Sequence, residues 1–303
     1  MFPSSVSRAA AGILAAALFM APAAAGAGGR IELVDDVGAT VFLATPARRV
    51  VCLSPGAVEI IYELKQEGKL TAACSLCDYP KAARDLPKVG DFISVSLESI
   101  LAADPDLVVA TGGIQRDLVL KLWKIGVPVV VLYPHSVDGV MDNIRLLGAA
   151  LGCEGRSRRL VKRLRDRILA VQSRMGKITG PERPLVYFEI SPDPLMAVGG
   201  LGYVNDLISL AGGVNVARGS GEEYPRISSE YLVNADPEVI ILSYTSDPAD
   251  ALATVRARPG WENVRAVKGG RVHADLDMDT ILRPGPRLTT GLEQLAERFH
   301  PPK

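Results

Sequence analysis

One stretch of this chain occurs twice. Residues 96–109 read SLESILAADPDLVV and residues 228–241 read SSEYLVNADPEVII, and the two align without a gap. Glu98 and Glu230 are equivalent positions, so the offset is 132 residues (230 minus 98). Repeats of about 20 to 50 residues are typical of solenoids, whereas a longer period that occurs twice indicates two similar domains.

An aromatic residue lies six positions before each of these glutamates. Phe92 and Tyr224 are therefore also 132 residues apart, and both lie in predicted loops that lead into a short helix. Two facing lobes could bring one ring from each side against a flat ligand, because stacked aromatic rings attract beyond their area of burial. Alternatively, each ring fills the core of its own lobe, since duplicated cores also repeat.

Glu98 and Glu230 allow two interpretations. Each lies in the first turn of a predicted short helix, where a negative charge stabilises the helix dipole. That role explains a single glutamate, but aspartate, serine or threonine would serve nearly as well there. Two carboxylates displayed symmetrically could instead be bound by arginines of a partner that also has two halves.

Length and charge limit the classes of function. With 303 residues, the chain is long enough for two domains of the usual roughly 100–200 residues each. Hydrophobic residues make up 48% and charged residues 22%, as in soluble globular proteins. Lys and Arg together number 34, and so do Asp and Glu, so no basic excess is available to neutralise a phosphate backbone. We therefore expect no nucleic-acid partner.

The first residues are typical of a secretory signal peptide. A basic residue precedes an apolar run over residues 9–20, and the small residues of APAAAGAGG follow it. A membrane anchor would need about 20 apolar residues in series. No cysteine follows the run, so no lipid attachment is indicated. We expect residues 1–27 to be cleaved off near Ala25 or Ala27, and the mature protein to be periplasmic.

The cysteines are Cys52, Cys74, Cys77 and Cys153. An oxidising compartment permits disulfides, and the sequence does not choose among the three possible full pairings. The CxxC spacing of Cys74 and Cys77 also fits a redox or zinc site, but the three histidines that could complete a zinc site are scattered. The motif runs into a turn signal, Asp78-Tyr79-Pro80, rather than into a helix. We expect neither a resident metal nor a cofactor.

Short apolar strands alternate with helical segments along most of the chain, after a predicted β-hairpin over residues 31–43. In the first half the predicted strands include 48–55, 106–110 and 127–133, and the predicted helices 57–68, 115–125 and 138–150. After Pro181 the pattern restarts with PLVYFEISP, whose final Ser-Pro repeats that of RRVVCLSP. This alternation indicates parallel sheets that are covered on both faces.

We therefore predict an α/β protein with two parallel-sheet lobes joined by one long helix. Apolar residues at 160, 161, 164, 168, 169, 171 and 175 form one stripe along a helix of roughly 30 Å. The predicted organisation is an N-terminal lobe over 30–153, an interdomain helix over 154–180 and a C-terminal lobe over 181–300. Ligands bind beyond the carboxyl ends of parallel strands, so two facing lobes predict a ligand cleft between them.

The chain lacks common signatures of enzymes: it has no P-loop, no GxGxxG after a strand, no GxSxG elbow and no HExxH. We therefore predict a binding protein without a catalytic step. Gly112, directly after a strand, would let the backbone approach a ligand closely. Arg283 and Arg287, in the proline-stiffened segment RPGPRL, lie at the rim of the predicted cleft or are structural. A secreted two-lobe enzyme that uses Cys77 and Asp279 is the alternative from another class.

Several longer segments resemble one known family. They are RRVVCLSPGAVEIIYEL, CDYPKAARDLPKVGDF, SLESILAADPDLVVATGG, GGLGYVNDLISLAGGVNV, ISSEYLVNADPEVIIL and RPGPRL. Together they resemble the periplasmic solute-binding proteins of ATP-driven importers in which a rigid helix joins the lobes, a class that serves cobalamin, haem and iron siderophores. The resemblance covers nearly all of the chain after the predicted signal peptide.

The resemblance implies roles for individual residues. It implies that Glu98 and Glu230 dock onto arginines of the two permease subunits of the importer, and that Tyr79, Phe92 and Tyr224 line the cleft. Phe188 and Asp279 are weaker implications for the same cleft. The CDYP turn and the aromatic residues before each glutamate are most similar to the cobalamin-binding members, although Phe92 and Tyr224 stand where tryptophans would be expected.

The expected cargo is therefore cobalamin or a related corrinoid, bound by a monomeric protein. Two alternatives keep the family but change the cargo. Haem would favour an iron ligand such as Tyr79. An anionic ferric siderophore would favour an arginine cluster, for which the candidates are Arg116, Arg283 and Arg287.

Overall fold

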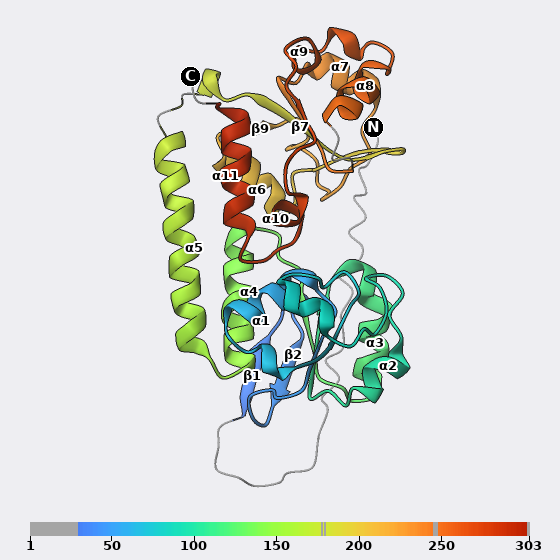
Figure 1. Cartoon of the computed structure of the whole chain (residues 1–303), viewed down its shortest axis with the longest axis vertical. Helices are drawn as coiled ribbons and strands as arrows, with labels where there is room; N and C mark the ends of the chain where they lie inside the picture. The colour runs from blue at the N-terminus through green and yellow to red at the C-terminus, as the bar shows by residue number, and fades with distance from the viewer. Residues whose placement is uncertain (1–29, 177, 179, 245–247, 302–303) are drawn as a thin grey trace, which may run out of the picture.

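The computed structural model describes residues 30–176, 178, 180–244 and 248–301. The predicted signal peptide, residues 1–27, lies outside these ranges. Within them the chain forms two α/β lobes stacked along the long axis of the molecule, with one long helix beside both (Figure 1). In the part of the chain that is described, no helix combines the length and the apolar character needed to cross a membrane.

The N-terminal lobe begins with the predicted hairpin and contains a four-stranded parallel sheet. The hairpin strands are β1 (Ile31–Val34) and β2 (Thr40–Leu43), which pair antiparallel. The sheet has the order β4-β3-β5-β6, with β3 at Val50–Cys52, β4 at Leu70–Ala73, β5 at Leu107–Thr111 and β6 at Val129–Leu132. Almost every residue of these four strands is buried, as the continuous apolar runs predicted.

Helices connect these strands. They are α1 (Pro55–Glu63), α2 (Leu97–Ala102), α3 (Arg116–Lys124) and α4 (Val137–Ala150), with 3-10 turns at Glu67–Lys69, Lys81–Asp85 and Gly113–Gln115. The helix predicted over 57–68 is shorter than expected, since α1 ends at Glu63. It also starts earlier, because a proline is well suited to the first turn of a helix and Pro55 begins α1.

The long interdomain helix is α5 (Glu154–Met175), which spans about 33 Å at the α-helical rise per residue. The predicted apolar stripe packs inward at Leu160, Val161, Leu164, Ile168 and Val171, whereas Leu169 is 58% exposed. The stripe contacts α4 in the N-terminal lobe and α11 (Leu288–Phe299) in the C-terminal lobe.

The C-terminal lobe contains a five-stranded sheet. Its strands are β7 (Leu185–Pro192), β8 (Leu195–Ala197), β9 (Val214–Asn215), β10 (Val239–Leu242) and β11 (Val272–His273). Strand β8 pairs antiparallel with the end of β7, and the other pairings are parallel. The helices are α6 (Tyr203–Leu210), α7 (Ser229–Ala235), α8 (Pro248–Arg256), α9 (Arg265–Lys268), α10 (Met278–Leu282) and α11, with 3-10 turns at Gly180–Glu182 and Trp261–Asn263.

The two lobes share one topology. The parallel strands run β4-β3-β5-β6 in the first lobe and β9-β7-β10-β11 in the second, so the third strand of each path, β5 or β10, follows the repeated helix α2 or α7. Even a rare backbone conformation recurs, because Asp104 and Asp236 both have positive φ, 48° and 51°.

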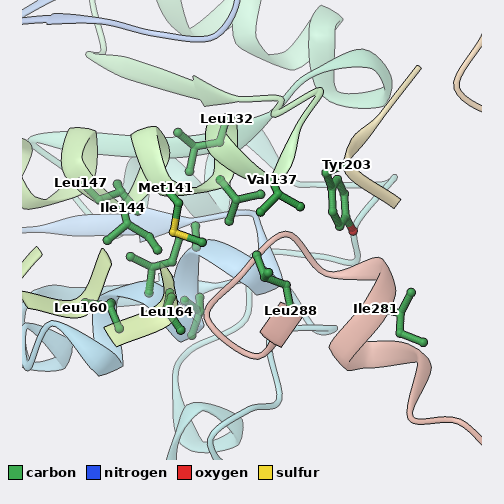
Figure 2. Close-up of a cluster of buried hydrophobic side chains, with 14 of the residues drawn as sticks. Leu132, Val137, Met141, Ile144, Leu147, Leu160, Leu164, Tyr203, Ile281 and Leu288 are labelled. Carbon is green, nitrogen blue, oxygen red and sulfur yellow. The ribbon is translucent and has the colours of Figure 1, made fainter. Parts of the chain in front are cut away.

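The lobes also share a hydrophobic core. One buried cluster includes residues of α4 and α5 as well as Tyr203, Ile281 and Leu288 from the C-terminal lobe (Figure 2). The helix α6 contacts both α4 and α5. The lobes are therefore joined by packed side chains as well as by the covalent helix connection.

Candidate functional site

Two arginines of the C-terminal lobe bind carboxylates of the N-terminal lobe. Arg287 donates two hydrogen bonds to Glu59, Nε to Oε2 at 2.9 Å and Nη2 to Oε1 at 2.7 Å. Arg283 Nη1 donates to Asp78 Oδ1 at 2.7 Å. We call these four residues, together with Tyr79, the interlobe contact.

The backbones come close at the same place. A Cβ on Gly56 would lie 2.6 Å from the carbonyl oxygen of Pro284, so only glycine fits there. Glu59 lies on α1 and is 2% exposed. Burial raises the pKa of its carboxyl, while the hydrogen bonds from Arg287 oppose that effect. The same hydrogen bonds raise the pKa of the Arg287 guanidinium.

Further carboxylates surround the two arginines. Arg283 Nη2 lies 2.9 Å from Asp279 Oδ2, and Arg287 Nη1 lies 3.5 Å from Asp277 Oδ2. The arginine side chains are only 16% and 18% exposed. Two guanidinium groups thus face four carboxylates, counting Glu59 and Asp78. The positive charge of both arginines is already balanced within the protein.

The ring of Tyr79 packs against Arg287 at the interlobe contact. The guanidinium carbon of Arg287 lies 3.9 Å from the centroid of the Tyr79 ring, which is cation–π geometry. Tyr79 is 46% exposed, so its other parts face solvent. The predicted site residues Tyr79, Asp279 and Arg283 are therefore brought together.

Phe92 and Tyr224 both lie outside the fully buried cores of their lobes. Phe92 is half-buried, belongs to none of the three buried hydrophobic clusters of the described residues, and its carbonyl oxygen accepts from Gln115 Nε2 at 3.1 Å. Tyr224 is also half-buried and packs against the cluster that both lobes share. Burial raises the pKa of its phenol, and neighbouring Glu223 adds to the effect.

A second polar link joins the lobes beside Tyr224. Tyr133, directly after β6, donates its hydroxyl to Glu223 Oε2 at 2.8 Å. The ring of Tyr133 lies where a side chain on Gly112 would be, since a Cβ there would be 2.5 Å from Tyr133 Cγ. Gly112 therefore makes room for this ring, a role that differs from the predicted approach of backbone to ligand.

Tyr203, the first residue of α6, lies between the lobes close to these groups. It is 3% exposed, and its hydroxyl has no hydrogen-bond partner among the described residues. Burial raises the pKa of this phenol, with smaller contributions from Tyr224, Glu223 and Glu59. Its side chain belongs to the shared cluster of Figure 2.

Sequence reasoning missed Glu59, Tyr133, Tyr203 and Glu223. The Glu59–Arg287 pair spans 228 residues of sequence and the Tyr133–Glu223 pair spans 90, so no local pattern marks them. The one available signal was the placement of Tyr133 directly after β6 and of Tyr203 at the start of α6. Glu59 lies inside α1 and Glu223 lies in a loop, so neither has such a signal.

Two predicted ligand-binding residues lie elsewhere. Phe188 is fully buried in the middle of β7, where Ile241 of β10 is its register partner. The strand continues to Pro192, so Phe188 is not at its carboxyl end and its ring forms part of the core. Arg116 is exposed at the first residue of α3 and takes no part in the interlobe contact.

Glu98 and Glu230 are both exposed in the first turns of α2 and α7. Hydrogen bonds from their own backbone N–H groups lower the pKa of both carboxyls, and the hydroxyls of Ser96 and Ser228 contribute in the same direction. Both carboxylates are therefore held charged. The helices α2 and α7 lie in different lobes, both on the side of the molecule away from α5 (Figure 1).

The cysteines do not form a metal site or a nucleophilic centre. Among the described residues, no group of three or more His, Cys, Asp or Glu side chains is arranged to hold a metal ion. Cys77 is 1% exposed, and its hydrogen bond with Cys74 together with burial raises the pKa of its thiol. The enzyme alternative required a reactive Cys77, and this environment disfavours the thiolate.

Comparisons with known proteins agree with this architecture. A model of the family described as periplasmic binding protein matches residues 50–277. An uncharacterised ABC transporter substrate-binding lipoprotein of Bacillus subtilis is 30% identical over 276 residues, which cover 89% of this chain and 86% of that protein.

Two solved structures are similar over most of their length. The periplasmic vitamin B12 binding protein of Vibrio cholerae matches with a TM-score of 0.73 and 26% identity, over 84% of this chain and 97% of that one. A periplasmic heme-binding protein from Roseiflexus matches with a TM-score of 0.73 and 27% identity, over 84% and 98%.

Proposed function

This chain belongs to the periplasmic binding protein family of ABC transporter substrate-binding proteins, and from that premise we propose that it captures cobalamin or a related corrinoid between its lobes. The captured corrinoid is then delivered to the membrane permease of an importer. The protein acts outside the cytoplasm and carries out no chemical step on its cargo.

The ion pairs that Arg283 and Arg287 already form with carboxylates of the protein are the observation on which the choice of cargo rests. Haem presents two propionates, and many ferric siderophores are anionic, so both require unpaired cations at the site. Here the guanidinium group of Arg283 is paired with Asp78 and Asp279. The guanidinium group of Arg287 is paired with Glu59 and Asp277. A corrin ring carries neutral amide side chains, which hydrogen-bond to carboxylates and phenols without needing a free cation.

The half-buried aromatic rings support the same cargo. Phe92 and Tyr224 come from equivalent positions of the two lobes, and neither ring is fully buried in the core of its own lobe. We propose that they stack on opposite faces of the flat macrocycle, with Tyr79 beside them. Stacking would add about 0.5–1.5 kcal/mol per ring to the gain from burial.

Calorimetric titration with cobalamin tests this proposal. We expect the purified protein to bind cobalamin, and Phe92→Ala and Tyr224→Ala each to weaken binding by about tenfold or more. Phe42→Ala is the matched control, because Phe42 is an exposed aromatic on the β1–β2 hairpin and should leave affinity unchanged. Absence of cobalamin binding by the wild-type protein would refute the assigned cargo.

Haem is the second candidate, and the exposed phenol of Tyr79 is the observation that favours it. A tyrosine oxygen can bind haem iron directly. If haem is the cargo, haemin should bind with a distinct absorption band that Tyr79→Phe abolishes. If corrinoid is the cargo, Tyr79→Phe should leave most of the cobalamin affinity intact.

We further propose that Glu98 and Glu230 are the contacts to the permease. Their equivalent positions, exposure and depressed pKa values present one charged carboxylate on each lobe. Charge-assisted pairs with arginines of two permease subunits would hold the protein in one orientation.

The double variant Glu98→Ala/Glu230→Ala tests the docking role. Uptake of cargo by cells should be lost while the affinity of the purified protein for its cargo stays unchanged. Glu154→Ala is the matched control, since Glu154 is an exposed glutamate in the first turn of α5, on the other side of the molecule. Loss of cargo affinity in the double variant would contradict the separation of roles.

A further inference from the structure

The buried cysteines of the N-terminal lobe have no role in the function proposed above. We propose that Cys74 and Cys77 form a disulfide after export, and that this bond fixes the loop that carries Asp78 and Tyr79 to the interlobe contact. The inference depends on the extracytoplasmic location of the family, where disulfides persist. It does not depend on the identity of the cargo.

The backbone brings these two cysteines within reach of each other. Cys74 follows β4, and the N–H of Cys77 donates to the carbonyl oxygen of Cys74 at 3.1 Å. A hydrogen bond between residues i and i+3 closes a β-turn, in which the two Cα atoms lie within about 7 Å. Disulfides join Cα atoms about 4.4–6.8 Å apart, so the turn already has the required span.

The side chains are also in contact. Both are buried, at 0% and 1% exposure, in the same hydrophobic cluster. Neighbouring Cys77 is the main cause of the lowered pKa of Cys74, and neighbouring Cys74 is the main cause of the raised pKa of Cys77. The Cys77 thiol also donates to the carbonyl oxygen of Cys52 at 3.8 Å.

The other two cysteines are less suitable partners. Cys52 on β3 lies beside the turn, and its carbonyl oxygen accepts from the N–H of Cys74 at 3.1 Å. Its own thiol donates to the carbonyl oxygen of Ser54 at 3.4 Å, and burial raises its pKa. Cys153 lies at the start of α5, where its charged neighbours are Lys69, Arg156 and Glu154.

The bond would form by thiol–disulfide exchange. The thiolate of one cysteine attacks one sulfur of an oxidised dithiol oxidoreductase, or of oxidised glutathione in vitro, and displaces a thiolate. The other cysteine then loses its proton to solvent and attacks the sulfur of the first, which releases the second thiolate. The two cysteines lose two electrons and two protons, and the oxidant becomes two thiols. Because both sulfurs are buried in the folded chain, the exchange takes place before the loop packs.

The proposed disulfide lies directly before the residues that contact the two arginines of the other lobe. The two residues that follow Cys77 are Asp78, which accepts from Arg283, and Tyr79, whose ring lies against Arg287. The backbone of the turn is also held by Lys88, whose Nζ donates to the carbonyl oxygen of Cys77 at 3.1 Å. A bond across the turn would restrict the residues through which the N-terminal lobe meets the two arginines.

Peptide mapping of cargo-free protein purified from the periplasm tests the bond itself. Free thiols are alkylated in denaturant, and the protein is then cut with trypsin. Cleavage after Lys69 and Lys81 places both cysteines in one peptide, while Cys52 falls in residues 50–65 and Cys153 in residues 146–156. We expect peptide 70–81 to be unlabelled and about two mass units below its dithiol form.

Two mapping results would overturn the proposal. One is peptide 70–81 with two labels, and the other is a cross-link between peptides 70–81 and 50–65. Because no cargo is present, this outcome is independent of whether the protein binds corrinoid.

A pair of variants tests what the bond does. Cys74→Ser/Cys77→Ser should lower the melting temperature by roughly 3–8 °C and weaken cargo binding several-fold. Cys153→Ser should change neither. If the double variant does not fold, the mapping of the wild-type protein still decides whether the bond exists. A double variant that melts and binds like Cys153→Ser would show that the bond does not fix the loop.

Discussion

At the scale of single residues, Glu59 is the most consequential group in the molecule. It lies on α1, is almost fully buried, and holds Arg287 of the other lobe with two hydrogen bonds. A buried carboxylate is costly unless it is paired, so removing its charge leaves a largely buried guanidinium without its main partner.

We expect Glu59→Gln to lower the free energy of unfolding by about 2–4 kcal/mol in urea titrations. Asp166→Asn is the control, because Asp166 forms an exposed pair with Lys162 along α5 and should cost less than about 0.5 kcal/mol. If the two variants lost the same small amount, the interlobe contact would not be a stabilising one.

Some site residues could be predicted from the sequence and others could not. Tyr79, Asp279 and Arg283 were predicted and lie together; Tyr79 and Arg283 belong to the quoted segments CDYPKAARDLPKVGDF and RPGPRL, and Asp279 was a weaker implication of the resemblance. Glu59 was not predicted, since its partner is distant in sequence and its own surroundings read as an ordinary helix. The resemblance implied that Phe188 lines the cleft, but the strand continues four residues beyond it to Pro192, which the resemblance does not show.

At the scale of elements, the repeat predicted the fold well. The strands β5 and β10 and the helices α2 and α7 occur where the two copies predicted them, because propensity and capping serine act locally. Ser96 and Ser228 both cap their helices by accepting from the N–H three residues later. The antiparallel strand β8 depends on its tertiary pairing with β7 and was not predicted. The helix α1 ends at Glu63 rather than at the predicted residue 68.

The equivalent aspartates at the ends of these repeated helices make a matched comparison. Both have the left-handed backbone that glycine adopts freely. The Asp104 side chain is 88% exposed and lies 3.6 Å from Arg49 Nε, whereas the Asp236 carboxylate accepts from Arg265 N and Nε, both at 2.8 Å.

Asp104→Gly should therefore change the unfolding free energy by less than about 0.5 kcal/mol, because backbone relief offsets the entropy of glycine. Asp236→Gly should cost about 1.5–3 kcal/mol through its lost hydrogen bonds. Chemical denaturation of both variants measures the difference. Equal effects at the two positions would show that the hydrogen bonds from Arg265 to Asp236 add no stability beyond the exposed ion pair of Asp104 with Arg49.

At the scale of the whole molecule, the lobes are joined by a shared hydrophobic core, whereas the sequence predicted a connection through one helix alone. The sequence predicted the connection through α5, but the packing of α4, α5, α6 and α11 into one cluster depends on how the lobes face each other. Such a core limits relative motion of the lobes, since packed interiors resist small displacements.

The two tryptophans of the chain test this coupling. Trp123 lies on α3 in the N-terminal lobe, and Trp261 is fully buried in the C-terminal lobe. With Trp123→Phe and Trp261→Phe, the fluorescence of each lobe can be followed separately during urea unfolding. We expect both probes to report a single transition with the same midpoint. Two separate midpoints would mean that the lobes are stabilised independently.

The cargo is the central claim about the molecule as a whole, and the visible absorption spectrum of protein purified from its native periplasm tests it most directly. Corrinoid, haem and ferric siderophores absorb at clearly different wavelengths. We predict the spectrum of a bound corrinoid. A haem or ferric siderophore spectrum in the same preparation would contradict the account of an aromatic site between the lobes whose arginines are already paired with carboxylates.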